Sequence, residues 1–86
     1  MDTPILEFPC AFPLKVMGRD TPEFRTAACT IVERHAGPVP AAGVTSRASS
    51  EGNFLALTFA ITAASRAQLD ALYQELSSCP QILVAL

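Results

Sequence analysis

The fold of this chain is decided by residues 12–35, which read FPLKVMGRDTPEFRTAACTIVERH. In residues 12–17 the apolar side chains alternate with a second set, the period of two that is typical of a strand with one face on a core. The predicted core-facing side chains are Phe12, Leu14 and Val16, and those of the other face are Pro13, Lys15 and Met17. Gly18 ends this predicted strand.

A helix is predicted directly after the strand. Pro22 suits its first position, where no backbone N–H is needed, and Asp20 or Thr21 can cap it. The helix is predicted to end near His35, because glycine and two prolines follow in the loop 36–43. Apolar side chains recur along the helix at a helical spacing that faces a core. They are Phe24, Ala27, Ala28, Ile31 and Val32.

The next two strands are predicted to form a hairpin. Residues 44–50 are polar, as expected of a strand at a sheet edge. Residues 51–53 form a short turn with glycine and asparagine, and residues 54–63 alternate again between a core face and an opposite face.

A second helix and a terminal strand complete the chain. Ser65 with Gln68 forms a capping box, and Pro80 stops the helix. Residues 81–86 carry apolar side chains on both faces, which predicts a well-covered strand. The apolar stripe of the helix consists of Leu69, Leu72, Tyr73 and Leu76.

The predicted order is βαββαβ, an α+β ferredoxin-like sandwich. Right-handed crossovers place both helices on one face of a four-stranded antiparallel sheet with strand order 4-1-3-2. Residues 1–11 are predicted to be an extended arm, and residues 12–86 a single domain. The face away from the helices is partly apolar and is expected to need a cover, either the arm or another subunit. Its predicted residues are Lys15, Met17, Ala56, Thr58, Ala60, Leu83 and Ala85.

Composition argues against several classes of function. The net charge is −2, and six scattered basic residues form no stripe for a phosphate backbone, so nucleic acid is not an expected partner. The N-terminus lacks the features of a signal peptide, and the apolar run 54–64 is too short to cross a bilayer. We therefore expect a cytoplasmic protein with no membrane partner.

The side chains that carry catalysis are few and dispersed. Cys10, Cys29 and Cys79 are expected to be reduced thiols, and with a single histidine they assemble no metal site. His35 is interpreted as a cap or a satisfied, partly buried residue rather than a base. The sequence thus predicts no catalytic residue, no cofactor and no enzyme, with a small enzyme of unrecognised type as the least favoured alternative.

The turn of Gly18, Arg19, Asp20 and Thr21 is the one candidate ligand site. It joins the first strand to the first helix, where backbone donors and polar side chains can meet a small anion or amino acid. Helix capping alone accounts for the same residues and is the simpler interpretation.

Five segments together resemble the YbeD-like family of small uncharacterised bacterial proteins. The resemblance runs through residues 6–86 and implies a fold similar to the ACT-type regulatory domains, which bind small effectors beside metabolic enzymes. Family members are often encoded near lipoate-attachment genes. The ACT-type ligand position corresponds here to Gly18 to Thr21, with Asp20 as the best polar candidate. The segments are LEFP at 6–9, KVMG at 15–18, RHA at 34–36, SEGN at 50–53 and LYQEL at 72–76.

Two hypotheses of function follow. The first is a non-enzymatic regulatory domain of ACT-like type, as a monomer or a homo-oligomer, which senses a small-molecule effector or docks on a metabolic enzyme linked to lipoate metabolism. The alternative is a protein-interaction module without a small-molecule ligand, whose far sheet face or polar second strand meets a partner protein.

Overall fold

The computed structural model describes residues 7–49 and 51–86. The predicted α+β ferredoxin-like class and the βαββαβ order are confirmed. Most of the predicted arm, residues 1–6, lies outside the described residues. The elements are β1 (Cys10–Arg19), α1 (Pro22–Ala36), the 3-10 helix η1 (Ala41–Gly43), β2 (Val44–Ala48), β3 (Phe54–Ala63), α2 (Arg66–Ser78) and β4 (Val84–Ala85).

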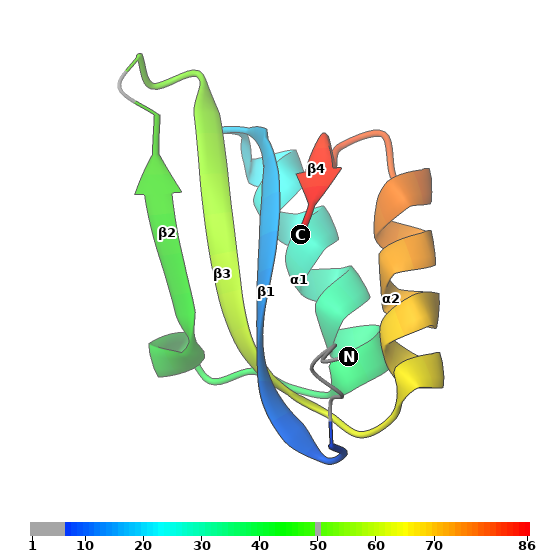
Figure 1. Cartoon of the computed structure of the whole chain (residues 1–86). Helices are drawn as coiled ribbons and strands as arrows, with labels where there is room; N and C mark the ends of the chain where they lie inside the picture. The colour runs from blue at the N-terminus through cyan, green and yellow to red at the C-terminus, as the bar shows by residue number, and fades with distance from the viewer. Residues whose placement is uncertain (1–6, 50) are drawn as a thin grey trace, which may run out of the picture.

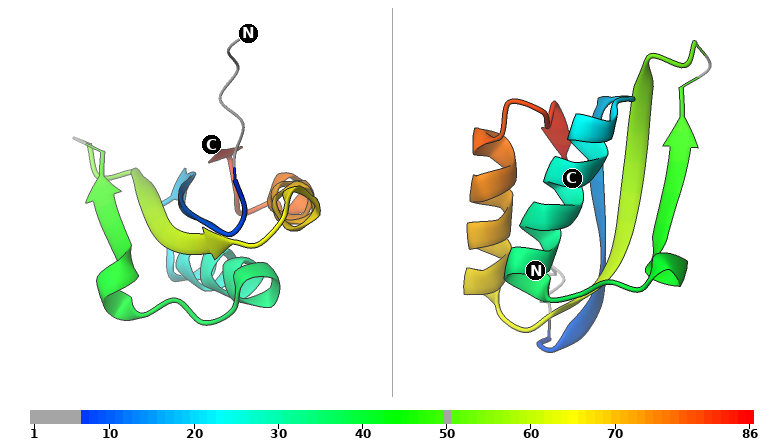
Figure 2. Two further views of the ribbon diagram at one scale, coloured as in Figure 1. Left: turned by 60° about the horizontal axis from the view of Figure 1, so that its bottom comes forward. Right: turned by 180° about the vertical axis from the view of Figure 1, so that it is seen from behind.

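One antiparallel sheet and one layer of helices make up the described chain. The strand order is β2-β3-β1-β4, which is the predicted order read from the other edge. Both helices lie behind the sheet in Figure 1 and in front of it in the reverse view of Figure 2. The fold therefore has a helix-covered face and a face with no helix on it.

The ladder between β1 and β3 is the longest in the sheet. It pairs all ten residues of each strand, from Cys10 opposite Ala63 to Arg19 opposite Phe54. β1 consequently extends beyond the predicted span at both ends, because β3 supplies a hydrogen-bonding partner for Gly18 and Arg19 as well.

The core lies between the sheet and the two helices. Both predicted caps are present: the Thr21 side chain accepts a hydrogen bond from the Phe24 N–H, and the Ser65 side chain accepts one from the Gln68 N–H, each at 3.1 Å. These caps set the first residue of each helix, and with it the start of the apolar side chains that pack against the sheet. The buried core residues are Leu14, Val16, Phe24, Ala28, Ile31, Val32, Leu55, Leu57, Phe59, Ile61, Ala63, Leu69, Leu72, Leu76 and Ile82.

The prediction of a well-covered terminal strand is wrong. β4 has two residues, and the side chains of Val84 and Leu86 are 42% and 66% exposed. Ile82 enters the core, but a bend at Leu83 interrupts the alternation, and Ala85 then lies opposite the buried Val16. The strand pairs through a short stretch of backbone, and its larger side chains stay outside the core.

Gly18 is the point of closest approach between β1, α1 and the segment before β4. A methyl group built on Gly18 would overlap the ring of Phe24 and come within 2.6 Å of the carbonyl oxygen of Gln81. Glycine is required here because neither the buried ring nor the backbone has room to move.

We predict that Gly18→Ala lowers the free energy of unfolding by about 1–3 kcal/mol, the usual cost of overpacking. Urea unfolding followed by circular dichroism measures this change. Gly43→Ala is the matched control, because its methyl group would meet a Val39 methyl at 3.2 Å and Ala60 at the ordinary contact distances of 3.7 and 3.8 Å, without the overlap found at Gly18. Equal effects of the two substitutions would contradict the steric role of Gly18.

Candidate functional site

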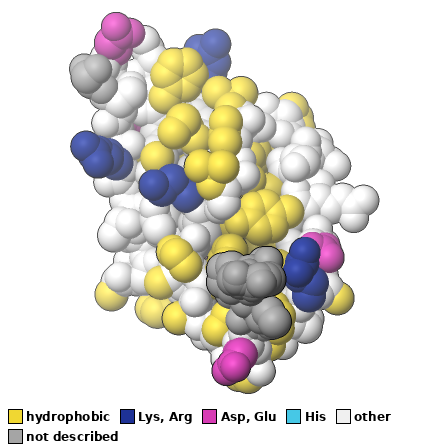
Figure 3. Space-filling view, in the orientation of Figure 1, with side chains coloured by type: hydrophobic (Ala, Val, Ile, Leu, Met, Phe, Trp, Pro, Cys, Tyr) yellow, Lys and Arg dark blue, Asp and Glu magenta, His cyan; other side chains and the backbone are white. Residues whose placement is uncertain are grey.

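The sheet face opposite the helices is uncovered by any helix or strand of residues 7–49 and 51–86, and we call it the open face (Figure 3). Figure 3 shows hydrophobic side chains gathered over its upper half, with basic side chains around them. The central residues of the open face are Lys15, Met17, Arg19, Thr45, Arg47, Phe54, Ala56, Thr58, Val84 and Leu86.

The register of the strands arranges the side chains of the open face in rows across the sheet. One row crosses all four strands, because Arg47 lies opposite Ala56, Ala56 opposite Met17, and Met17 opposite Val84. In the next row Lys15 exchanges backbone hydrogen bonds of 3.1 and 2.7 Å with Leu86. Residues in one row project from the same side of the sheet, so these side chains are neighbours.

The apolar part of the open face is exposed. Met17 and Phe54 are 37% and 38% exposed, and with Val84 and Leu86 they are four of the five large apolar side chains that the described residues expose. The Arg19 guanidinium lies 5.7 Å from the centre of the Phe54 ring, within the range of a cation–π contact. Exposed apolar side chains scattered singly are ordinary on protein surfaces, whereas these four are gathered on one face.

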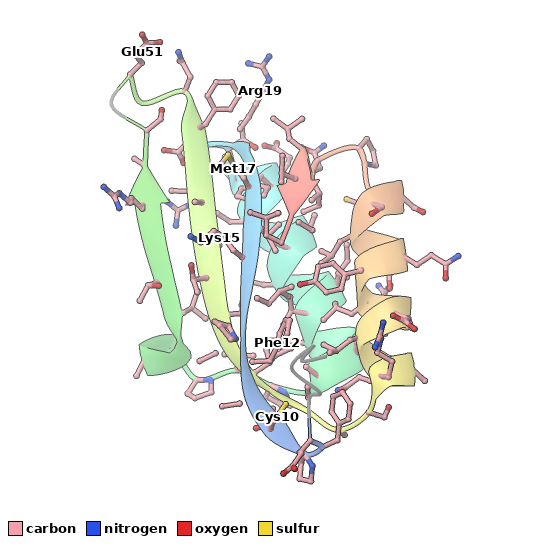
Figure 4. All side chains as sticks on the ribbon, viewed as in Figure 1. Cys10, Phe12, Lys15, Met17, Arg19 and Glu51 are labelled. Carbon is pink, nitrogen blue, oxygen red and sulfur yellow. The ribbon has the colours of Figure 1, made fainter. Side chains whose placement is uncertain are left out.

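The charge of the open face has a single sign. The four strands contain no acidic residue, and their three basic residues are Lys15, Arg19 and Arg47. Figure 4 shows Lys15, Met17 and Arg19 following one another along β1. Each lies opposite a residue of the exposed face of β3, so the cations and the apolar side chains share one surface.

Two adjoining hollows lie on the open face. The first has a volume of about 170 Å³ and is lined mainly by apolar atoms of Met17, Phe54 and Ala56 beside Arg47. The second, of about 360 Å³, is lined by Lys15, Thr45, Ser46, Arg47, Ala56 and Thr58. Because Arg47 and Ala56 border both hollows, an apolar site and a cationic site are contiguous.

The sequence predicted this face in part. Lys15, Met17, Ala56, Thr58 and Ala60 lie on it as predicted. Ala85 does not, because the bend at Leu83 interrupts the alternation and brings Val84 and Leu86 to this side, and Leu83 itself lies in that bend, where its N–H donates to the Met17 carbonyl. Arg19 was assigned to a turn and not to the sheet face; the extra length of β1 places it here.

The turn predicted as a ligand site lies at the end of β1. Gly18 is packed against Phe24, and Thr21 caps α1. Asp20 forms an ion pair of 3.6 Å with Arg25, and its N–H donates to the Asn53 carbonyl at 3.1 Å. Capping and packing account for these contacts, and a ligand at this turn stays a prediction.

His35 belongs to a polar cluster that joins the two helices. Its Nε2 lies 2.6 Å from Glu75 Oε1, and Arg34 is hydrogen-bonded to the other oxygen of the same carboxylate. The Gln68 amide donates to the His35 carbonyl at 2.7 Å. His35 is therefore a satisfied, partly buried residue, as predicted, and the cluster fixes α1 against α2.

Nearby, the Tyr73 ring meets Phe12 edge-on with centroids 6.5 Å apart, and burial raises the pKa of the Tyr73 hydroxyl. Within the described parts of the chain, no group of three or more His, Cys, Asp or Glu side chains could hold a metal ion. Cys10, Cys29 and Cys79 are free, partly buried thiols. No described helix is long and apolar enough to cross a membrane.

We predict that Glu75→Ala destabilises the fold by about 1 kcal/mol, because one carboxylate serves both Arg34 and His35 in a partly exposed setting. Thermal unfolding measures the change. Asp70→Ala is the control, since among the described residues Asp70 has only an exposed pair with Arg66 at 3.6 Å, and its loss should change stability by less than about 0.5 kcal/mol. An equal response of both variants would show that the cluster does not join the helices.

Comparison with known proteins identifies relatives along nearly the whole chain. A family model described as protein of unknown function (DUF493) matches residues 3–86. A UPF0250 protein of Paraburkholderia phytofirmans is 43% identical over 82 residues, which are 95% of this chain and 92% of that protein. A UPF0250 protein of Leptothrix cholodnii is 45% identical, covering 95% and 90% of the two chains. One from Neisseria meningitidis serogroup B is 42% identical, covering 98% and 92%.

Proposed function

The chain belongs to the DUF493 family of proteins of unknown function, which is consistent with the resemblance to the YbeD-like family of small bacterial proteins. We therefore propose its function from its own geometry. The protein is a non-enzymatic regulatory domain of ACT-like type that docks on a metabolic enzyme through its open face. The observation that carries this proposal is the cluster of four exposed apolar side chains next to three cations on a sheet face that no described helix or strand covers. Their clustering favours binding, because apolar side chains in the centre of a contact supply most of its energy.

A protein partner suits this surface better than a small molecule. Small-molecule sites bury about 70–90% of their ligand in concave pockets. Here the hollows of about 170 and 360 Å³ lie side by side on an exposed face, so a small ligand would keep much of its surface in water. A partner protein would cover both hollows and the apolar side chains of β4 together.

The resemblance to the YbeD-like family directs the search for this enzyme to lipoate metabolism in the cytoplasm. The regulatory hypothesis and the alternative, an interaction module without a small-molecule ligand, both require docking on a partner protein. They differ in whether a small-molecule effector changes the affinity of that docking. The presence of a partner is therefore the first property to test, and the effector the second.

We predict that a photoreactive phenylalanine analogue at position 54 cross-links the protein to one bacterial enzyme in living cells. The same analogue at Gln74, exposed on α2, is the control and should give no such product. Binding of the purified enzyme should weaken at least about tenfold in Met17→Ser/Phe54→Ser, because central apolar contacts dominate binding energy. Gln74→Ser changes an exposed side chain of α2, away from the open face, and should bind normally. Equal cross-linking from positions 54 and 74, or none, would contradict the proposal.

An effector at Gly18 to Thr21 is the second candidate function. The observation in its favour is continuity: Arg19 belongs to this turn and also lies over Phe54 on the open face. The Asp20 side chain keeps 33% of its surface exposed beside Arg25. A small anion or amino acid bound at the turn would thus contact a side chain of the docking surface.

For this candidate we predict a rise in thermal stability with one member of a panel of amino acids, lipoate-related acids and nucleotides. A ligand at one hundred times its Kd adds about 2.7 kcal/mol to the free energy of unfolding. Asp20→Ala should lose the shift, and Asp70→Ala should keep it. If no compound shifts the unfolding temperature, the effector is contradicted and the interaction module without a ligand is favoured.

A further inference from the structure

On the premise that the proposed docking is correct, the charge and shape of the open face restrict the chemical class of the partner. We infer that the open face binds an acidic, amphipathic segment of another protein, whose apolar side chains cover Met17, Phe54 and Val84 and whose carboxylates meet Lys15, Arg19 and Arg47. The inference rests on charge sign, on strand register and on the two contiguous hollows.

The charges are separated between the open face and the rest of the chain. Three of the six basic residues lie on this face, and the other described residues carry three basic and seven acidic residues. The charge of the described residues therefore divides into +3 on the open face and −4 elsewhere. Among the described residues, no acidic side chain forms an ion pair with Lys15, Arg19 or Arg47, whereas Arg25, Arg34 and Arg66 each have one.

The two hollows match the two parts of such a segment. The apolar hollow of about 170 Å³ is comparable with the roughly 150 Å³ cavity that holds a benzene ring, so it accepts one large apolar side chain. The second hollow borders it and places Lys15 and Arg47 beside two threonine hydroxyls, a setting in which a carboxylate gains charge-assisted hydrogen bonds. An apolar side chain and a carboxylate close together on one segment fill both hollows at once.

A second copy of the chain does not fit this surface. Two copies related by a two-fold axis through the open face would bring two sets of three cations together without a carboxylate between them. Contact of the open face with a different surface of another copy would be head-to-tail, which leads to rings or open filaments. The charge pattern thus favours a different protein.

Nucleic acid and membranes fit the open face less well. Phe54 is the one aromatic side chain of this face, whereas single-stranded nucleic acid needs a series of stacking platforms along a basic groove. Recognition of anionic lipid by basic clusters uses about four to eight Lys or Arg residues. Three cations around an apolar centre, on a chain of net charge −2, are better matched to a discrete acidic patch.

The test uses a designed helical peptide of about 14 residues, with leucine at positions i, i+3, i+4 and i+7 and glutamate at the others. A second peptide keeps the leucines and replaces every glutamate by lysine. Binding to the full-length protein is measured by isothermal titration calorimetry, and the contact is mapped by amide chemical shifts. We expect the glutamate peptide to perturb β1 and β3 and the lysine peptide to bind at least about tenfold more weakly.

Salt and charge reversal complete the test. Binding of the glutamate peptide should weaken between about 0.1 M and about 1 M salt, and also in Lys15→Glu/Arg47→Glu. Arg25→Glu/Arg66→Glu makes the same change of net charge on the helices and should bind normally. Equal binding of the two peptides, no binding, or tighter binding to anionic vesicles or single-stranded RNA than to the peptide would overturn the inference.

Self-association gives a further independent outcome. Sedimentation equilibrium should show that Lys15→Glu/Arg47→Glu and the wild type have the same mass in solution. A dimer that the reversal abolishes would overturn the acidic partner and assign the face to a second copy. If cross-linking from position 54 to an enzyme persists while salt and charge reversal have no effect, the docking function stands and only the acidic character of the partner fails.

Discussion

The antiparallel ladder between β1 and β3 is the constraint from which both faces of this molecule follow. It pairs ten residues of each strand without interruption, so every side chain of the two central strands is assigned to one face or the other. Leu14 and Val16 enter the core with Leu57 and Phe59, and the residues between them project away from the helices. A slip of one residue would exchange the two sets and bury Lys15. The burial of the core therefore fixes the composition of the open face.

Most of the fold could be predicted because its signals are local. Alternation, helical stripes and capping residues lie within single elements, and glycine and prolines mark the breaks between them. The terminal strand was mispredicted because its course depends on distant contacts. Ile82 is buried in the core, and the Leu83 N–H donates to the Met17 carbonyl at 2.8 Å. The bend at Leu83 therefore reverses the alternation that sequence periodicity alone predicts.

The candidate site was less predictable than the fold. Sequence periodicity predicts Met17 and Ala56 on the face away from the helices, but only the register brings Arg47, Ala56, Met17 and Val84 into one row across four strands. The turn at Gly18 was singled out by its composition, and a requirement for close packing explains its glycine. The absence of any acidic residue from the strands was a signal available in the sequence, and it becomes informative once the strands are known to share a face.

In a sheet with helices on one side only, the side chains of the other side must either suit contact with water or be covered by another surface. Many one-sided antiparallel sheets do so with polar side chains, which keep that face in water. Here threonine and lysine fill part of this role, while Met17, Phe54, Val84 and Leu86 do not. Exposed apolar side chains of this kind invite nonspecific association. The three basic side chains around these apolar residues repel a second copy of the same face and attract acidic groups. In the proposed docking, the same three residues both limit self-association and select an acidic partner, which is the combination that a small docking domain needs.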